Sequence, residues 1–128
     1  AAGARRSYGI ERPLPESQKL RELLRLIECM RASDNRCKCV IFSRSSELLE
    51  AVEDLLISRP AAHGYGRECA RMIDGKYTRE YKENALNHFK SSADCWALLL
   101  TISGFAAGLD LPEARYCFLL EPQENRTK

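Results

Sequence analysis

The sequence predicts an α/β fold of three layers, in which a mostly parallel sheet is flanked by helices. Two observations predict it. Short apolar runs of strand type alternate with amphipathic helical segments along the whole chain, and such alternation is typical of a parallel sheet that is covered on both faces. The 128 residues, of which 45% are hydrophobic, are about the size of one domain with a buried core.

Three segments have the apolar spacing of amphipathic helices, at 17–31, 45–58 and 78–90. Each starts at a hydroxyl residue that can cap a helix: Ser17, Ser45 or Ser46, and Thr78. In the third segment, Tyr81 shares the apolar face with Phe89, so we expect Tyr81 to be buried.

Four short apolar runs between and after these helices are predicted strands, at 37–42, 69–74, 95–101 and 115–121. Residues 1–16 are rich in Ala, Gly, Arg and Pro and have no apolar period, so we expect a flexible arm or linker there. The lobe itself is expected in 17–128.

Charge and cysteine content narrow the classes of function. With 20 Lys and Arg against 18 Asp and Glu, a nucleic acid would have to be held by a local basic cluster. The six cysteines lie in apolar segments and no signal segment opens the chain, so we expect buried thiols in an intracellular protein. The pair Cys37-x-Cys39 is too closely spaced for a typical zinc site. The uncharged run 95–109 is shorter than the roughly twenty residues that span a bilayer, so no membrane association is expected.

Polar residues follow two of the predicted strands. Thr101, Ser103, Gly108 and Asp110 lie at the carboxyl end of the run 95–101, where parallel sheets gather ligands, although a plain strand and turn would also fit. After the run 69–74, Lys76, Thr78 and Arg79 place two cations and a hydroxyl at a helix N-terminus. Such a terminus can bind a phosphate, or it can be an ordinary capped helix with solvated charges.

Four blocks then occur in a fixed order: a helix that begins Ser-x-Lys-Leu, VIFSR, IDGKYTREYKENALNHF and LLLTISGFAAGLDLPEARYCFLLEP. In this order they resemble the second RecA-like lobe of superfamily-two helicases. Within that superfamily the chain is most similar to the Swi/Snf group of DNA-translocating ATPases. The resemblance runs from about Ser17 to Asn125.

The resemblance implies which residues meet the ligands. Nucleotide contacts fall on Gly108 and on Asp110, which would meet the ribose. DNA-backbone contacts fall on the following residues: Ser43, Arg44, Gly75, Lys76, Thr78, Arg79, Lys82, Thr101 and Ser103. The chain departs from the family pattern at several of its positions: Lys82 stands for an arginine, Ser103 for a lysine, Phe105 and Ala106 for two glycines, and Glu121 for an aspartate.

The resemblance also implies what a whole enzyme would need. The only Gly-Lys pair, Gly75-Lys76, is followed by Tyr77, so the phosphate-binding loop of ATPases is absent, and the family's arginine finger would follow Lys128. We therefore expect no catalytic residue, metal ligand or ATP hydrolysis in this chain alone, and ATP with Mg²⁺ in the full-length enzyme.

The expected partners are the backbone of double-stranded DNA, the N-terminal RecA-like lobe of the same protein and chromatin or DNA-repair proteins, in the nucleus. Two alternatives stay open. One is the second lobe of a DEAD-box-like RNA helicase, favoured by Gly-Leu-Asp-Leu-Pro but disfavoured by the Ser-x-Lys-Leu helix. The other is a degenerate lobe that serves as an interaction module.

Overall fold

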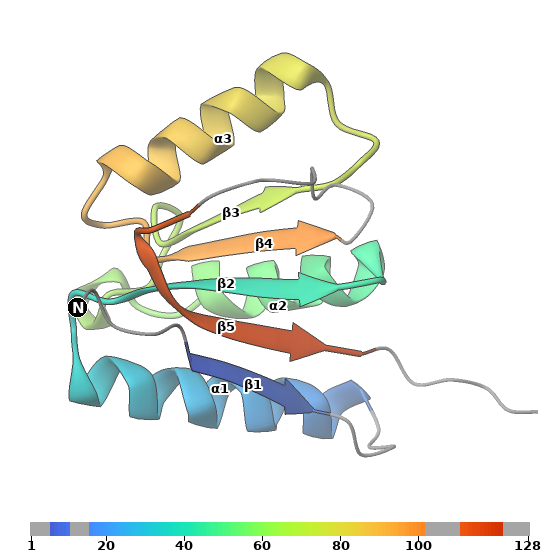
Figure 1. Cartoon of the computed structure of the whole chain (residues 1–128). Coiled ribbons are helices and arrows are strands. Elements are labelled where there is room, and N and C mark those ends of the chain that lie inside the picture. The colour runs from blue at the N-terminus through green and yellow to red at the C-terminus, as the bar shows by residue number, and fades with distance from the viewer. Residues whose placement is uncertain (1–5, 11–15, 102–110, 122–128) are drawn as a thin grey trace, which may run out of the picture.

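The computed structural model describes residues 6–10, 16–101 and 111–121 (Figure 1). Strands and helices alternate along it as the sequence predicts. In chain order the elements are β1 (Arg6–Ile10), α1 (Glu16–Ser33), β2 (Lys38–Ser43), α2 (Ser46–Ile57), a 3₁₀ turn (Ala61–His63), β3 (Ala70–Ile73), α3 (Arg79–Ser91), β4 (Ala97–Thr101) and β5 (Ala114–Leu120).

The five strands form one sheet in the order β1-β5-β2-β4-β3, and every neighbouring pair is parallel. On the central strand, Ile41 lies opposite Leu99 of β4 on one side and Phe118 of β5 on the other. This confirms the expected parallel sheet. Because all strands run the same way, their carboxyl ends meet at one edge of the sheet and their amino ends at the opposite edge.

Helices cover both faces of the sheet, which confirms the three-layer architecture. Helices α1 and α2 lie on one face and α3 lies on the other (Figure 1). Alternate residues of each strand serve the two sides: Ile41 and Leu99 pack under α1 and α2, whereas Val40 and Leu98 pack under α3. Each of these strands is a continuous apolar run in the sequence because both of its faces are buried.

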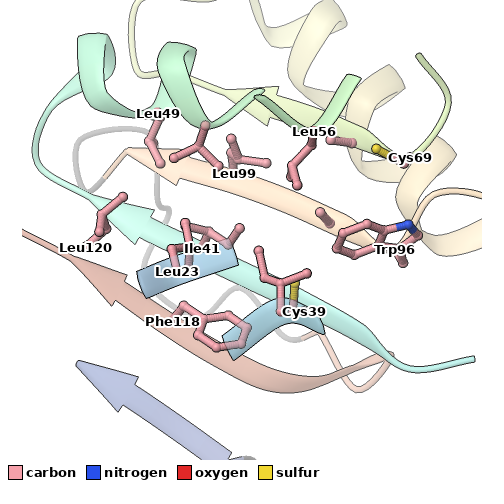
Figure 2. Packing of buried hydrophobic residues seen from close by; sticks show 14 of the residues in the cluster. Leu23, Cys39, Ile41, Leu49, Leu56, Cys69, Trp96, Leu99, Phe118 and Leu120 are labelled. Carbon is pink, nitrogen blue, oxygen red and sulfur yellow. The ribbon is translucent and has the colours of Figure 1, made fainter. Parts of the chain in front are cut away.

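The larger of the two cores lies between the sheet and helices α1 and α2. Figure 2 shows Leu23 of α1 and Leu49 and Leu56 of α2 gathered around Ile41, Leu99 and Phe118 of the strands. All of these side chains are fully buried or nearly so. Burial of each one stabilises the fold by about 1.5 to 3 kcal/mol relative to an exposed side chain, before the entropy of ordering is subtracted.

Hydroxyl caps define the starts of two helices, as the sequence predicts. The Ser45 Oγ accepts a hydrogen bond from the Leu48 amide at 3.1 Å, and the Thr78 Oγ1 accepts one from the Tyr81 amide at 3.1 Å. Each bond satisfies an amide that the first helical turn would otherwise leave without a partner. The first helix begins at Glu16, one residue before the expected cap.

The expectation of an irregular arm is wrong for five residues of the segment 1–16. Arg6–Ile10 forms β1, an edge strand paired in parallel with β5, so that Tyr8 lies opposite Phe118. The segment has no apolar alternation and contains Gly9, so local propensity does not indicate a strand there. Pairing with a strand at the other end of the chain decides its conformation.

The expected burial of Tyr81 is also wrong, because its side chain is 47% exposed. Tyr81 stands in the first turn of α3 and packs edge-on against Tyr77, with ring centroids 4.8 Å apart. The buried face of α3 begins one turn later, at Ala85 and Phe89. Helical spacing identifies the face of a helix but not how far the sheet extends beneath it.

The six cysteines all lie in the described part of the chain and form no disulfide. Four of them are buried as expected, namely Cys37, Cys39, Cys69 and Cys95, whereas Cys29 on α1 is exposed. Burial raises the pKa of the Cys69 and Cys95 thiols to about 11. Among the helices that the structure describes, none is both long and apolar enough to cross a bilayer.

Candidate nucleic-acid interface

The carboxyl ends of β2, β4 and β3 lie side by side, because these strands are neighbours in the sheet. We call the residues there the carboxyl edge: Ser43 and Arg44 after β2, the segment 74–82 after β3, and Thr101 at the end of β4. The structure thus brings together most of the predicted DNA-binding residues.

A buried aspartate shapes the turn after β3. Asp74 is 4% exposed, its Oδ1 accepts a hydrogen bond from the Lys76 amide at 3.3 Å, and its main-chain oxygen accepts one from the Tyr77 amide at 3.0 Å. Burial raises the pKa of Asp74, but hydrogen bonds from the Ser46 hydroxyl and the Lys76 amide outweigh it, so the pKa is lowered. Asp74 is therefore ionised at neutral pH and holds the turn through its own acceptors.

The neighbouring glycine ties the turn after β3 to the end of β4 and to α3. The Gly75 amide donates a hydrogen bond to the buried Thr101 hydroxyl at 3.3 Å, and the Gly75 carbonyl accepts one from the Lys82 Nζ at 3.3 Å. The ammonium of Lys82 thus lies over the turn from which α3 starts. Its contact in the structure is with the protein backbone, so Lys82 positions the segment 74–78 as well as adding positive charge to it.

The N-terminus of α3 presents the cations of the carboxyl edge. Lys76 is exposed, and the Arg79 side chain is 93% exposed, with an ion pair of 3.3 Å between its Nε and Glu83 Oε1. A pair this exposed contributes little to stability and gives way easily. Beside these cations the first-turn amides of α3 point outward from the helix end, so the arrangement suits an anion such as a phosphate.

The two residues at the end of β2, Ser43 and Arg44, have different environments. Ser43 is fully buried and its hydroxyl accepts a hydrogen bond from the Ser45 amide at 3.1 Å, so it supports the turn into α2. Arg44 is exposed, and its Nη2 and Nε lie 2.9 and 3.0 Å from Glu121 Oε2. The fork of Arg44 is thus already oriented along the carboxyl edge by a carboxylate at the end of β5.

Sequence reasoning assigned no role to Lys19, the lysine of the Ser-x-Lys-Leu block. Its side chain is 2% exposed, and its Nζ donates a hydrogen bond to the main-chain oxygen of Glu121. The same residue that orients Arg44 is therefore anchored from α1. The sequence signal for this role was slight: Lys19 stands one residue before the apolar Leu20 in an amphipathic helix.

The predicted nucleotide-binding residues Gly108 and Asp110, and Ser103 among the DNA-binding ones, lie outside the described residues. Among the residues that the structure describes, no three His, Cys, Asp or Glu side chains gather as metal ligands. Of the carboxylates described near the carboxyl edge, Asp74 accepts the Lys76 amide through its Oδ1, and Glu121 holds Arg44. This part of the edge does not fit Mg²⁺.

Comparison with known proteins gives both sequence and structural relatives. The chain is 31% identical over 110 residues to DNA repair protein RAD5B of Arabidopsis thaliana, and this alignment covers 86% of the chain and 8% of RAD5B. It is 29% identical over 107 residues to DNA repair protein rad8 of Schizosaccharomyces pombe, and this alignment covers 84% of the chain and 9% of rad8. The chain thus spans less than a tenth of these relatives.

The fold has a counterpart among solved structures. The Sulfolobus solfataricus SWI2/SNF2 ATPase C-terminal domain superposes with a TM-score of 0.61 at 13% identity, over 80% of this chain and 48% of that one. Residues 18–128 match the family model of the helicase conserved C-terminal domain. Because this match covers most of the chain, the chain belongs to the helicase conserved C-terminal domain family.

Proposed function

We propose that this lobe forms one wall of the DNA groove and part of the inter-lobe ATP cleft of a DNA-dependent ATPase that translocates on double-stranded DNA. The names of the relatives favour a nuclear enzyme of the DNA-repair type, although chromatin remodelling belongs to the same proposal. Relatives named for DNA repair also favour this reading over an RNA helicase of the DEAD-box type.

The observation that carries the proposal is the construction of the segment 74–79. Its backbone is held from two sides, by the Thr101 hydroxyl through Gly75 and by the Asp74 carboxylate through Lys76, whereas the side chains of Lys76 and Arg79 are exposed. A rigid backbone with outward cations suits phosphates, which carry no sequence information. The lobe would therefore hold duplex DNA by its backbone.

ATP bound between the two lobes would supply, with Mg²⁺, the phosphoryl-transfer chemistry. On this side of the cleft Asp110 would bind the ribose and Gly108 would allow close approach of the backbone. The described residues contribute a tether between the turn after β3 and the end of β4, since Gly75 and Thr101 are joined by a hydrogen bond. A shift at the end of β4 would then move the DNA-binding turn.

A salt titration of DNA binding tests the proposal. We expect the chain to bind labelled duplex without sequence preference, with a Kd of about 10⁻⁴ to 10⁻⁶ M that weakens as salt rises. Arg79→Ala should reduce the dependence of log K on log salt by about one unit, because one cation–phosphate contact is lost. The matched control is Lys90→Ala, which removes one exposed charge from the last turn of the same helix.

The control makes the test decisive. If Arg79→Ala and Lys90→Ala leave the same salt dependence, or if the chain binds one DNA sequence in preference to others, the carboxyl edge does not hold a DNA backbone.

A further inference from the structure

A second group of polar and aromatic side chains lies at the opposite edge of the sheet, where the strands begin. Arg31 stands in the last turn of α1, Arg59 follows α2, and Trp96 immediately precedes β4. Two hollows of about 460 and 380 Å³ open there and share Arg31 and Tyr65 in their walls. The predicted DNA-binding residues that the structure describes all lie at the carboxyl edge, away from this group.

The guanidinium of Arg31 is fixed by aromatic rings. Its Cζ lies 4.4 Å from the centroid of the Trp96 ring and 5.8 Å from that of Tyr65. The Trp96 Nε1 donates a hydrogen bond of 2.7 Å to the Gly64 carbonyl, which holds the indole in place at the end of the core cluster (Figure 2). Gly64 leaves room for the guanidinium, since a Cβ there would lie 2.0 Å from Arg31 Nη2.

The ring contacts leave the N–H groups of this guanidinium to be satisfied by another partner. In the part of the chain that the structure describes, the partners of Arg31 are rings, and it has no carboxylate or other hydrogen-bond acceptor. A half-buried arginine that lies against rings and has no acceptor among the described residues suits a planar anion, because its fork matches a carboxylate in two parallel hydrogen bonds.

Arg59 adds a second cation to the larger hollow. Its Cζ lies 5.1 Å from the Tyr65 ring centroid, and its Nε is buried without an acceptor among the described residues. The one carboxylate in the wall, Glu28, reaches Arg59 only at 3.5 Å and is itself more than half exposed, so this pair is weak. The hollow therefore keeps a positive balance, with Arg31 and Arg59 against Glu28.

We propose that Arg31 and Arg59 bind the carboxylate side chain of an acidic peptide segment supplied by a partner protein. The wall also contains Pro60 and the Tyr65 ring, which can pack against the methylene groups of a glutamate. The inference rests on the proposed function in one respect, namely that DNA lies at the carboxyl edge and leaves this edge open to protein.

The molecule carries its own reporter for the test. Trp96 is the single tryptophan of the chain and lies against Arg31, so a ligand that engages Arg31 should change its fluorescence. We expect a short glutamate peptide to give a saturable, salt-sensitive change, and a glutamine peptide of the same length to give none. Arg31→Gln should weaken glutamate-peptide binding about tenfold or more, because a charge-assisted fork is lost.

Matched variants separate charge from structure. Arg21→Gln removes one exposed charge from the same helix, ten residues or about 15 Å from Arg31, and should leave peptide affinity unchanged within about twofold. Arg31→Lys keeps the charge and the packing stem but not the fork, so its affinity should lie between wild type and Arg31→Gln. Arg59→Gln supplies a second loss if Arg31→Gln does not fold.

Each outcome decides the matter. Loss of affinity in Arg31→Gln and Arg59→Gln but not in Arg21→Gln supports the site, and unchanged duplex-DNA binding in these variants keeps it apart from the carboxyl edge. Peptide binding that survives both substitutions, or that falls equally in Arg21→Gln, overturns the proposal. Inorganic phosphate that competes as well as the glutamate peptide also overturns it in favour of a phosphate ligand. Failure of wild-type chain to bind DNA would instead count against the proposed function.

Discussion

The amide of Gly75 donates a hydrogen bond of 3.3 Å to the hydroxyl of Thr101 and so joins the turn after β3 to the end of β4. Thr101 is buried at the end of its strand, so its hydroxyl is a fixed point, whereas Gly75 begins the turn that carries Lys76 and Arg79. The position of the exposed cations is thereby set from inside the sheet.

Thr101→Val removes this hydroxyl with little change in shape. We expect the free energy of unfolding to fall by about 1 kcal/mol, since one hydrogen bond is lost and the Gly75 amide must find water. Affinity for duplex DNA should fall equally for all sequences, because the cations are held less firmly. Urea denaturation and a DNA titration measure the two effects. An unchanged affinity would show that the tether does not position the DNA-binding turn.

Leu99→Ala should cost about 2 to 5 kcal/mol of the free energy of unfolding, because it leaves a cavity between β4 and the helices above it. Leu99 is fully buried in the larger core and faces Ile41 across the sheet. Urea unfolding measures the loss, and Glu50→Ala on the exposed face of α2 serves as the control, with a change within about 0.5 kcal/mol. A Leu99→Ala variant as stable as the control would contradict the packing described here.

Asp74→Asn should destabilise the lobe at neutral pH and much less in acid. The pKa of Asp74 in the folded lobe is lowered from its usual 3.8, so the ionised carboxylate stabilises the fold above that pH. This stabilisation is lost as the pH falls through the lower folded value. Unfolding free energies of wild type and Asp74→Asn should therefore differ at pH 7 and converge below pH of about 4. A difference that is constant across this range would assign the effect to packing.

Thiol reactivity should distinguish Cys29 from the buried cysteines. At pH 8 a thiolate attacks a disulfide reagent and displaces one of the reagent's sulfurs as a thiolate. Burial raises the pKa of Cys69 and Cys95 to about 11, so these thiols are both covered and protonated. We expect Cys29 to supply the fast phase and Cys69 and Cys95 to react on unfolding only. Cys29→Ser should abolish the fast phase. If a fast phase of the same size remains in that variant, one of the other thiols is accessible in the folded lobe.

The sequence predicted the alternation of elements, the parallel sheet and the capped helices well, because each depends on local pattern. Tyr81 and β1 were predicted wrongly for a shared reason: both depend on how far the sheet extends, which is decided by pairing between distant segments. For the candidate site, the sequence predicted which positions take part. The structural roles of Ser43 and Lys82 could not be predicted, because the sequence does not distinguish a serine or lysine that supports a turn from one that binds a phosphate.

The order of strands in the sheet has a consequence for how the chain folds. Strands β2, β4 and β3 are neighbours and could pair before the last strand exists, but β5 lies between β1 and β2, so Arg6 meets Tyr116 and Ile41 meets Phe118. Contact order is therefore high, and such topologies fold slowly. During synthesis, the backbone of β1 and of one side of β2 stays unpaired until β5 has left the ribosome. A chaperone would be most useful in this interval.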